Sequence, residues 1–164
     1  MRNSTEYSNI EAELRNVIEE VLSTFPQGSA HLQSKSGKDG GIVISIIPTN
    51  PHAAPMGAHG ENGLALVDFW FGEFGTTWEL PIEGQNPRGT KLEVLAELRQ
   101  LCNAILDGHC EEKIGLFSTA GIIHVGKETY AIRNFFYLHW RRFFTGKRRI
   151  QYQPYIVGAP LPVK

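Results

Sequence analysis

The chain has 164 residues, of which 41% are hydrophobic and 20% charged, a composition typical of one globular domain and not of a disordered chain. The net charge of −1 conceals an asymmetry: residues 1–128 hold all seventeen acidic residues and nine basic ones, whereas residues 129–164 hold seven basic residues and no acidic one. The N-terminus has no apolar run of signal-peptide length, and there are two cysteines, so we expect a cytoplasmic protein with reduced thiols.

The apolar spacing predicts a first helix over residues 8–25, with a capping box formed by Ser8 and Glu11 at its start. Residues 30–34 and 41–47 then predict a β-hairpin. Residues 48–63 contain three prolines and three glycines, and we predict a long, mobile surface loop there.

A second hairpin is predicted from residues 64–71 and 76–80. In its first strand, one face carries Ala65, Val67, Phe69 and Phe71, and the other carries Leu66, Asp68 and Trp70. The sequence leaves open which face is buried, but a carboxylate favours the solvent side for Asp68.

A second helix is predicted to begin after Thr90, which forms a capping box with Glu93, and to end at Gly108. Its apolar stripe is expected to face the core, and it consists of Leu92, Leu95, Leu98, Leu101, Cys102, Ile105 and Leu106.

Residues 112–117 and 121–127 predict a third hairpin that turns at residues 118–120, and residues 150–157 predict a last strand. Between them, residues 130–145 predict a third helix, because aromatic and aliphatic residues recur there at helical spacing. The order of elements predicts a single α+β domain over residues 1–164, mainly an antiparallel sheet with about three helices packed on one face.

The basic C-terminal segment, residues 129–164, is the candidate interaction surface. Cations with nearby aromatic side chains can contact an acidic protein patch or nucleic-acid phosphates. The candidate partner-binding residues are Arg133, Tyr137, Arg141, Arg142, Lys147, Arg148 and Arg149. Charge runs of this kind more often complement a helix dipole or pair with the acidic part of the same molecule.

The sequence contains no pattern that predicts a catalytic, metal or cofactor site. Cys102, His109 and Cys110 lack the paired spacing of zinc ligands, and His139 falls within an apolar stripe. Residues 121–128 approach a phosphate-loop motif, but their interior favours a strand and Glu128 replaces the required hydroxyl.

Acidic pairs and loop histidines are the remaining candidates for chemistry. The adjacent carboxylates Glu19-Glu20 and Glu111-Glu112 should point in different directions, which disfavours a shared acid–base role. His52 and His59 in the predicted loop, with Asp68 on the next strand, are the residues that a small hydrolase would use.

We therefore expect a non-enzymatic cytoplasmic binding protein that acts through a charged macromolecular interface, with another protein as the first choice of partner. By analogy of size and charge alone, a bacterial toxin-immunity protein has this profile, with an acidic body that would receive a basic toxin. The alternatives are a nucleic-acid-binding protein that uses the basic C-terminal helix, and a small hydrolase that uses the His52/His59 loop.

Overall fold

The computed structural model describes residues 10–36, 41–60, 66–73, 75–81, 89–115, 118–135 and 148–156. In chain order, its elements are α1 (Ile10–Ser23), β1 (Ala30–Ser36), β2 (Ile42–Pro48), β3 (Met56–Gly60), β4 (Leu66–Phe71), β5 (Thr76–Pro81), α2 (Lys91–Leu106), β6 (Cys110–Ile114), β7 (Ser118–Val125), β8 (Glu128–Phe135) and β9 (Arg148–Gln151). Neither of these helices is long and apolar enough to cross a lipid bilayer.

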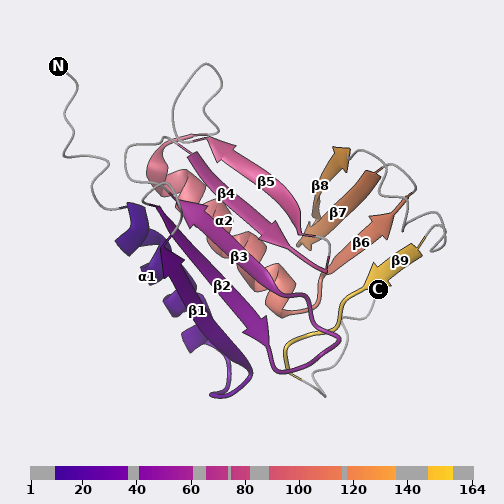
Figure 1. The fold of residues 1–164 in the computed structure, drawn as a ribbon, viewed down its shortest axis with the longest axis horizontal. Helices are drawn as coiled ribbons and strands as arrows, with labels where there is room; N and C mark the ends of the chain where they lie inside the picture. The colour runs from indigo at the N-terminus through magenta and orange to yellow at the C-terminus, as the bar shows by residue number, and fades with distance from the viewer. Residues whose placement is uncertain are drawn as a thin grey trace.

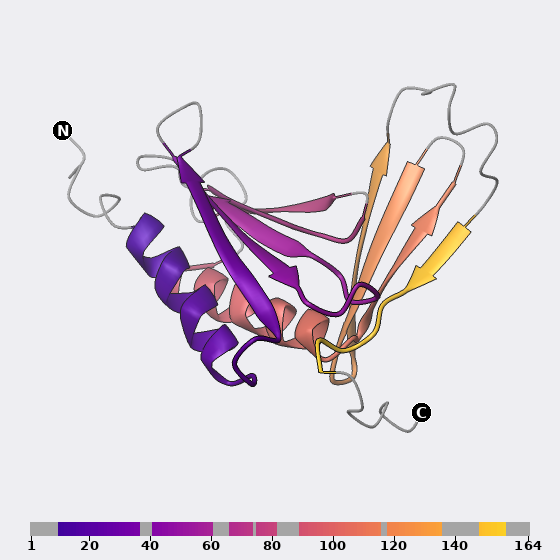
Figure 2. The same cartoon turned by 60° about the horizontal axis from the view of Figure 1, so that its bottom comes forward.

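The strands pair antiparallel in two sheets, one ordered β1-β2-β3-β4-β5 and the other β8-β7-β6-β9. Helices α1 and α2 lie side by side against one face of the five-stranded sheet (Figures 1 and 2). The four-stranded sheet stands at a steep angle beside β5, and β7 packs on α2. The α+β class and the antiparallel pairing are confirmed, although the described residues form two helices and not three.

Both predicted helices outside the basic segment are confirmed, and Ser8 of the capping box predicted for the first helix lies outside the described residues. In α1, Leu14, Val17, Ile18 and Val21 are buried at the expected spacing. In α2, Thr90 and Glu93 form the predicted capping box, and Gly108 follows the end with a φ of 76°.

Leu92 is an exception within the predicted stripe of α2, because it is 77% exposed. It lies in the first turn of the helix, whereas the buried residues run from Val94 to Leu106. Helical spacing alone does not show where the apolar stripe begins to meet the sheet.

The prediction of a surface loop over residues 48–63 is wrong for its central part. Met56–Gly60 is β3, the middle strand of the five-stranded sheet, and Met56, Gly57 and Ala58 are buried. Gly57 belongs there because Trp70 on the neighbouring strand β4 lies against it, and a Cβ atom at this position would overlap the indole ring.

The structure shows which face of β4 is buried, a point that the sequence left open. Val67, Phe69 and Phe71 are buried on the helix side, whereas Asp68 and Trp70 are partly exposed on the opposite side. The solvent side favoured for Asp68 is therefore confirmed.

The prediction of a third helix over residues 130–145 is wrong at its start, since Glu128–Phe135 forms β8 and pairs with β7 along its whole length. A two-residue turn, Gly126-Lys127, joins the two strands, and Gly126 has the positive φ of 59° that such a turn requires. Tyr130 and Ile132 pack against the core from this strand. Residues 136–145 lie outside the described residues.

Two strand boundaries also differ from the prediction. Residues 118–120, expected to form a turn, begin β7, because Ile114 pairs with Thr119 and the connection lies earlier in the chain. The last strand is Arg148–Gln151 and not residues 150–157, and beyond it Tyr152 and Tyr155 enter the core.

Candidate functional site

The outer face of the four-stranded sheet, on the side away from α2, carries a row of cations. Strand register places Arg149 opposite Lys113, Lys113 opposite Ala120, and Ala120 opposite Arg133. Residues that lie opposite one another share a face, so Arg149, Lys113 and Arg133 form one line across four strands. Three strand spacings of about 4.8 Å give that line a length of about 14 Å.

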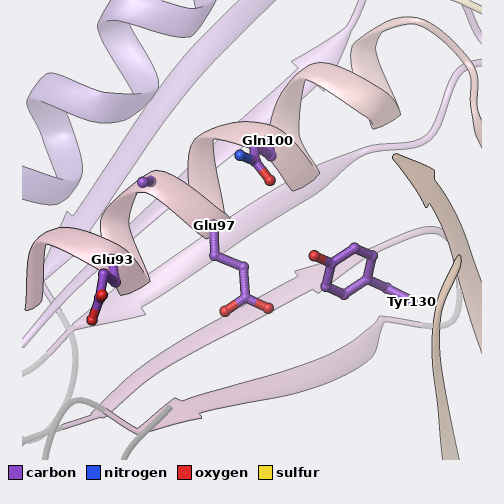
Figure 3. Close-up of a pocket in the computed structure, with 5 residues that line it drawn as sticks. Glu93, Glu97, Gln100 and Tyr130 are labelled. Atoms are coloured by element: carbon purple, nitrogen blue, oxygen red, sulfur yellow. The ribbon is translucent and has the colours of Figure 1, made fainter. Parts of the chain in front are cut away.

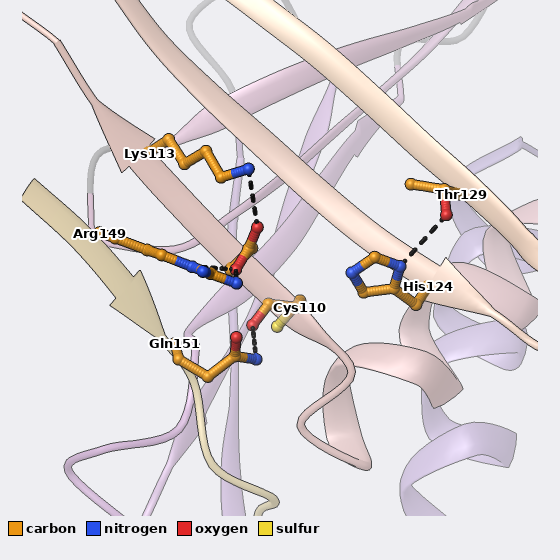
Figure 4. Close-up of polar contacts among 7 residues, drawn as sticks. Cys110, Lys113, His124, Thr129, Arg149 and Gln151 are labelled. Carbon is orange, nitrogen blue, oxygen red and sulfur yellow. Dashed lines mark hydrogen bonds and ion pairs between the residues drawn. The ribbon is translucent and has the colours of Figure 1, made fainter. Parts of the chain in front are cut away.

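Two of these cations converge on one buried carboxylate, Glu111, which is on the same face of β6 (Figure 4). Nε of Arg149 donates to Oε2 of Glu111 at 2.5 Å, and Nζ of Lys113 lies 3.2 Å from Oε1. The side chain of Glu111 is 4% exposed, whereas those of Arg149 and Lys113 are 63% and 52% exposed. Both cations therefore remain accessible while they cover the carboxylate.

The electrostatics of Glu111 follow from this arrangement. Burial acts to raise the pKa of its carboxyl, but hydrogen bonds and charges from Arg149 and Lys113 outweigh burial and lower the pKa below its ordinary value of 4.5. Glu111 is thus ionised at neutral pH. Across the two neighbouring rows, three cations face the one carboxylate of Glu111, which leaves two positive charges in excess among these described residues.

The positions between the cations are small or aliphatic. Ile122 lies opposite Glu111 and Ala131 lies opposite Ile122, one row along from Ala120. We call Lys113, Arg133, Arg149, Ala120, Ile122 and Ala131 the cationic sheet face. The face therefore has one row of cations, with an adjacent row that holds Glu111, Ile122 and Ala131.

The sequence identified part of this face. Arg133 and Arg149 are brought together as predicted members of one surface, but Arg148 projects from the opposite face of β9 because it neighbours Arg149 along the strand. Tyr137, Arg141, Arg142 and Lys147 lie outside the described residues. Lys113 was missed, and the signal that could have found it is the strand alternation of Glu111 and Lys113, which puts them on one side.

The acidic body of the chain is less acidic at its surface than the residue count suggests. Three helix carboxylates that could form an acidic surface each have a basic partner: Glu13 binds Lys91 at 2.9 Å, Glu20 binds Arg99 at 2.6 Å, and Glu19 lies 3.6 Å from Arg15. The separation of acidic and basic residues along the sequence is therefore weaker in the folded chain. These ion pairs neutralise helix carboxylates, and the pair of Arg149 with Glu111 neutralises a cation of the basic segment.

A groove of about 480 Å³ lies between α2 and β8 (Figure 3). It is lined by Glu93, Glu97, Gln100, Ala96 and Tyr130. Glu93 is engaged by the helix cap, because it accepts hydrogen bonds from the backbone and the hydroxyl of Thr90. These bonds lower the pKa of Glu93. Tyr130 donates to Glu128 at 3.0 Å.

The histidines and Asp68 of the hydrolase hypothesis are placed as follows. Nδ1 of His59 on β3 lies 3.6 Å from Oδ2 of Asp68 on β4, on the open face of the five-stranded sheet. His52 is exposed in the connection before β3, where its carbonyl accepts from the backbone of Gln153. Within the described part of the chain, no three side chains of the types that ligate metals are grouped together.

The two thiols are buried. Burial raises the pKa of Cys102 to about 12, and burial together with the charges of Glu112 and Glu111 raises the pKa of Cys110. Both are protonated at neutral pH, so neither has the thiolate that a nucleophile needs. Both pack as small apolar residues, as expected. His139 lies outside the described residues.

Glu111 and Glu112 point to opposite faces of β6, as predicted, but Glu112 has a structural role that sequence analysis missed. It is fully buried and accepts a hydrogen bond of 2.6 Å from the hydroxyl of Tyr152.

No family model, curated protein or solved structure matches this chain.

Proposed function

We propose that this chain is a non-enzymatic protein-binding module, and that the cationic sheet face is its contact surface. The row formed by Arg149, Lys113 and Arg133 is the observation that supports the proposal. The partner is a protein that presents carboxylates to the row of cations and a small apolar patch to Ile122 and Ala131 in the next row, because protein interfaces combine apolar and charged contacts.

The charge of the surface would act mainly on the rate of association. Exposed cations separated by about 14 Å steer an acidic partner toward the sheet, and this effect is stronger at low ionic strength. Lys113 and Arg149 are already held by Glu111, so they lose less side-chain freedom on binding than unrestrained cations would.

A basic partner, which the immunity analogy requires, is less well supported. Glu13, Glu19 and Glu20 are the helix carboxylates that a basic toxin would contact, and each already pairs with a cation of this chain. An immunity-type role in the cytoplasm is the narrower form of our proposal, and it requires a toxin with an acidic contact surface.

Nucleic acid is the alternative partner. Cations on an open sheet can contact phosphates, but single-strand binding also depends on rings on which bases stack. Ala120, Ile122 and Ala131, beside the cations, offer no such ring, and the imidazole of His124 lies one row further along β7. A protein partner fits these positions better.

The first testable prediction concerns charge reversal on this face. We expect the double variant Lys113→Glu/Arg133→Glu to bind a partner purified from native lysate about tenfold more weakly than the wild type, or weaker still. Isothermal titration calorimetry of the purified pair would measure this, at low and at physiological salt. Lys35→Glu, an exposed lysine on the other sheet, is the matched control and should retain affinity.

Equal affinity of the double variant and the wild type would refute the proposal. Titration of a labelled single-stranded oligonucleotide provides a second arm: binding that weakens steeply with salt and is lost in the double variant would assign the face to nucleic acid.

A further inference from the structure

The outer face of the five-stranded sheet is a second open surface, different in chemistry from the cationic sheet face. Figure 1 looks onto this face, with α1 and α2 behind the strands. Among the described elements, no helix or strand packs over it. Register aligns five residues across it in one row, in the order Gln33, Ser45, Gly57, Trp70 and Thr77.

Trp70 is the aromatic residue of this row. Its indole extends over Gly57 on β3, and Gly57 has no side chain that would prevent this approach. The position is therefore built for the ring: any larger residue at Gly57 would displace the indole atoms Cζ2 and Cε2. Trp70 remains partly exposed, whereas Trp78 on the helix side of the next strand is 2% exposed and stacks on Phe71.

Hydrogen-bonding side chains lie near the indole, and Val43 and Ile47 on β2 are aliphatic residues of the same face. The next row along the strands brings His59 and Asp68 together, with side chains 27% and 34% exposed. On the row of Trp70 itself, Thr77 and Ser45 are partly exposed and Gln33 is exposed. The hydroxyl of Thr77 donates to the carbonyl of Gly75 at 3.1 Å, so it offers a ligand its acceptor lone pairs. These groups include both donors and acceptors, so the surface can match the hydroxyls of a ligand that stacks on the ring.

The charges on this face exclude a polyanion. Asp68 and Glu79 lie opposite one another, and the cation in their row is Lys35, three strands away from Asp68 on the edge strand β1. A proline-rich peptide fits less well, because such ligands dock in grooves lined by several aromatic side chains. A neutral ligand with a flat apolar face and a periphery of hydroxyl groups matches both the exposed indole and the hydrogen-bonding side chains near it.

We propose that this face is a carbohydrate-binding platform, on which Trp70 stacks against a sugar ring while Asp68, His59 and Thr77 hydrogen-bond to its hydroxyls. Four strand spacings of about 4.8 Å make the row about 19 Å long, which accommodates several linked sugar units. The site is independent of the protein-binding surface proposed above, because the two lie on different sheets.

Titration with neutral oligosaccharides tests the proposal. The probes are cellohexaose, laminarihexaose and chitohexaose, with decaproline as a peptide control, followed by ¹H–¹⁵N NMR spectroscopy of the tryptophan indole N–H groups. We expect saturable shifts of the Trp70 indole with at least one of the sugars and none at the buried Trp78. Trp70→Phe assigns the signal and should retain part of the affinity, because it keeps a smaller ring.

Trp70→Ala should weaken binding about tenfold or more, because the stacking surface is lost. Thr77→Val, which keeps the shape of the side chain, should also weaken binding, and it remains informative if Trp70→Ala fails to fold. Because this variant also removes the bond to the carbonyl of Gly75, its unfolding curve should be compared with that of the wild type. Leu92→Ala removes an exposed apolar residue elsewhere and should bind as the wild type does. Absence of saturable shifts with every sugar, unchanged affinity in Trp70→Phe and Thr77→Val, or Trp70-dependent binding of decaproline alone would overturn the proposal.

Discussion

At the scale of single residues, the hydroxyl of Tyr152 joins the two sheets. It donates to Oε2 of Glu112 on β6 at 2.6 Å and accepts from the backbone N–H of Glu73, after β4, at 2.7 Å. Glu112 is fully buried, and Gly72 leaves the room that its carboxylate occupies. Burial, with the nearby Glu112 as the next cause, raises the pKa of Tyr152, so this hydroxyl keeps its proton and continues to donate.

Tyr152→Phe should therefore destabilise the fold. The variant removes one bond to the buried carboxylate of Glu112 and one to the backbone amide of Glu73, while it keeps the ring that contacts Phe71. Leaving buried polar groups without these bonds costs about 1–3 kcal/mol. Urea denaturation followed by circular dichroism would measure the loss in free energy of unfolding.

Tyr130→Phe is the matched control, because its hydroxyl bonds to the exposed Glu128 at the surface. Its effect should stay within about 0.5 kcal/mol. Equal effects of the two substitutions would show that the hydroxyl of Tyr152 does not hold the sheets together.

At the scale of elements, β8 depends on the turn before it. Gly126 adopts a φ of 59°, a conformation that is costly for residues with a Cβ atom. A helix in this region would place no such demand on Gly126, and alanine there would be neutral or favourable.

Gly126→Ala should accordingly lower the free energy of unfolding by about 1 kcal/mol, because an L-residue in this turn is strained. Chemical denaturation would measure the change. Gly115→Ala, in the connection between β6 and β7, is the control, since Gly115 has no left-handed φ and its nearest neighbour would be in ordinary contact at 3.4 Å. A stabilised Gly126→Ala variant would contradict the turn geometry described here.

At the scale of the whole molecule, a single core connects both sheets. One buried cluster contains residues from both sheets and from α2. Its members include Phe71 and Trp78 of the five-stranded sheet, Leu101 of α2, Ile123 of the four-stranded sheet, and Tyr152 after β9. A shared core of this kind predicts that the chain is one domain and unfolds in one cooperative step.

Native-state hydrogen exchange would test this. Amides in the centres of β4 and β7 should open with the same free energy, equal to that of global unfolding. A lower opening free energy for β7 than for β4 would show that the four-stranded sheet unfolds separately, and that the chain contains two units.

Local chemistry in the sequence determined much of this fold. Three signals each act over a few residues, so they could be recognised without knowledge of the rest of the chain. They are the capping box of Thr90 and Glu93, the helical spacing of Leu14, Val17 and Val21, and the strand alternation of Val67, Phe69 and Phe71. The surplus of cations after residue 128 was visible in the same way, and two of those cations, Arg133 and Arg149, do share one surface.

The tertiary structure determined the features that depend on pairing between distant strands. Helical spacing over residues 130–145 suggested a helix, but pairing with β7 supplies the backbone hydrogen bonds of β8, and Tyr130 and Ile132 gain burial in the core. A glycine at position 57 is typical of a loop, but in the structure Gly57 lies within β3, where it leaves room for the indole of Trp70. The cationic sheet face likewise exists only because register puts Lys113 between Arg149 and Ala120, and register is a relation between distant segments that no single stretch of sequence contains.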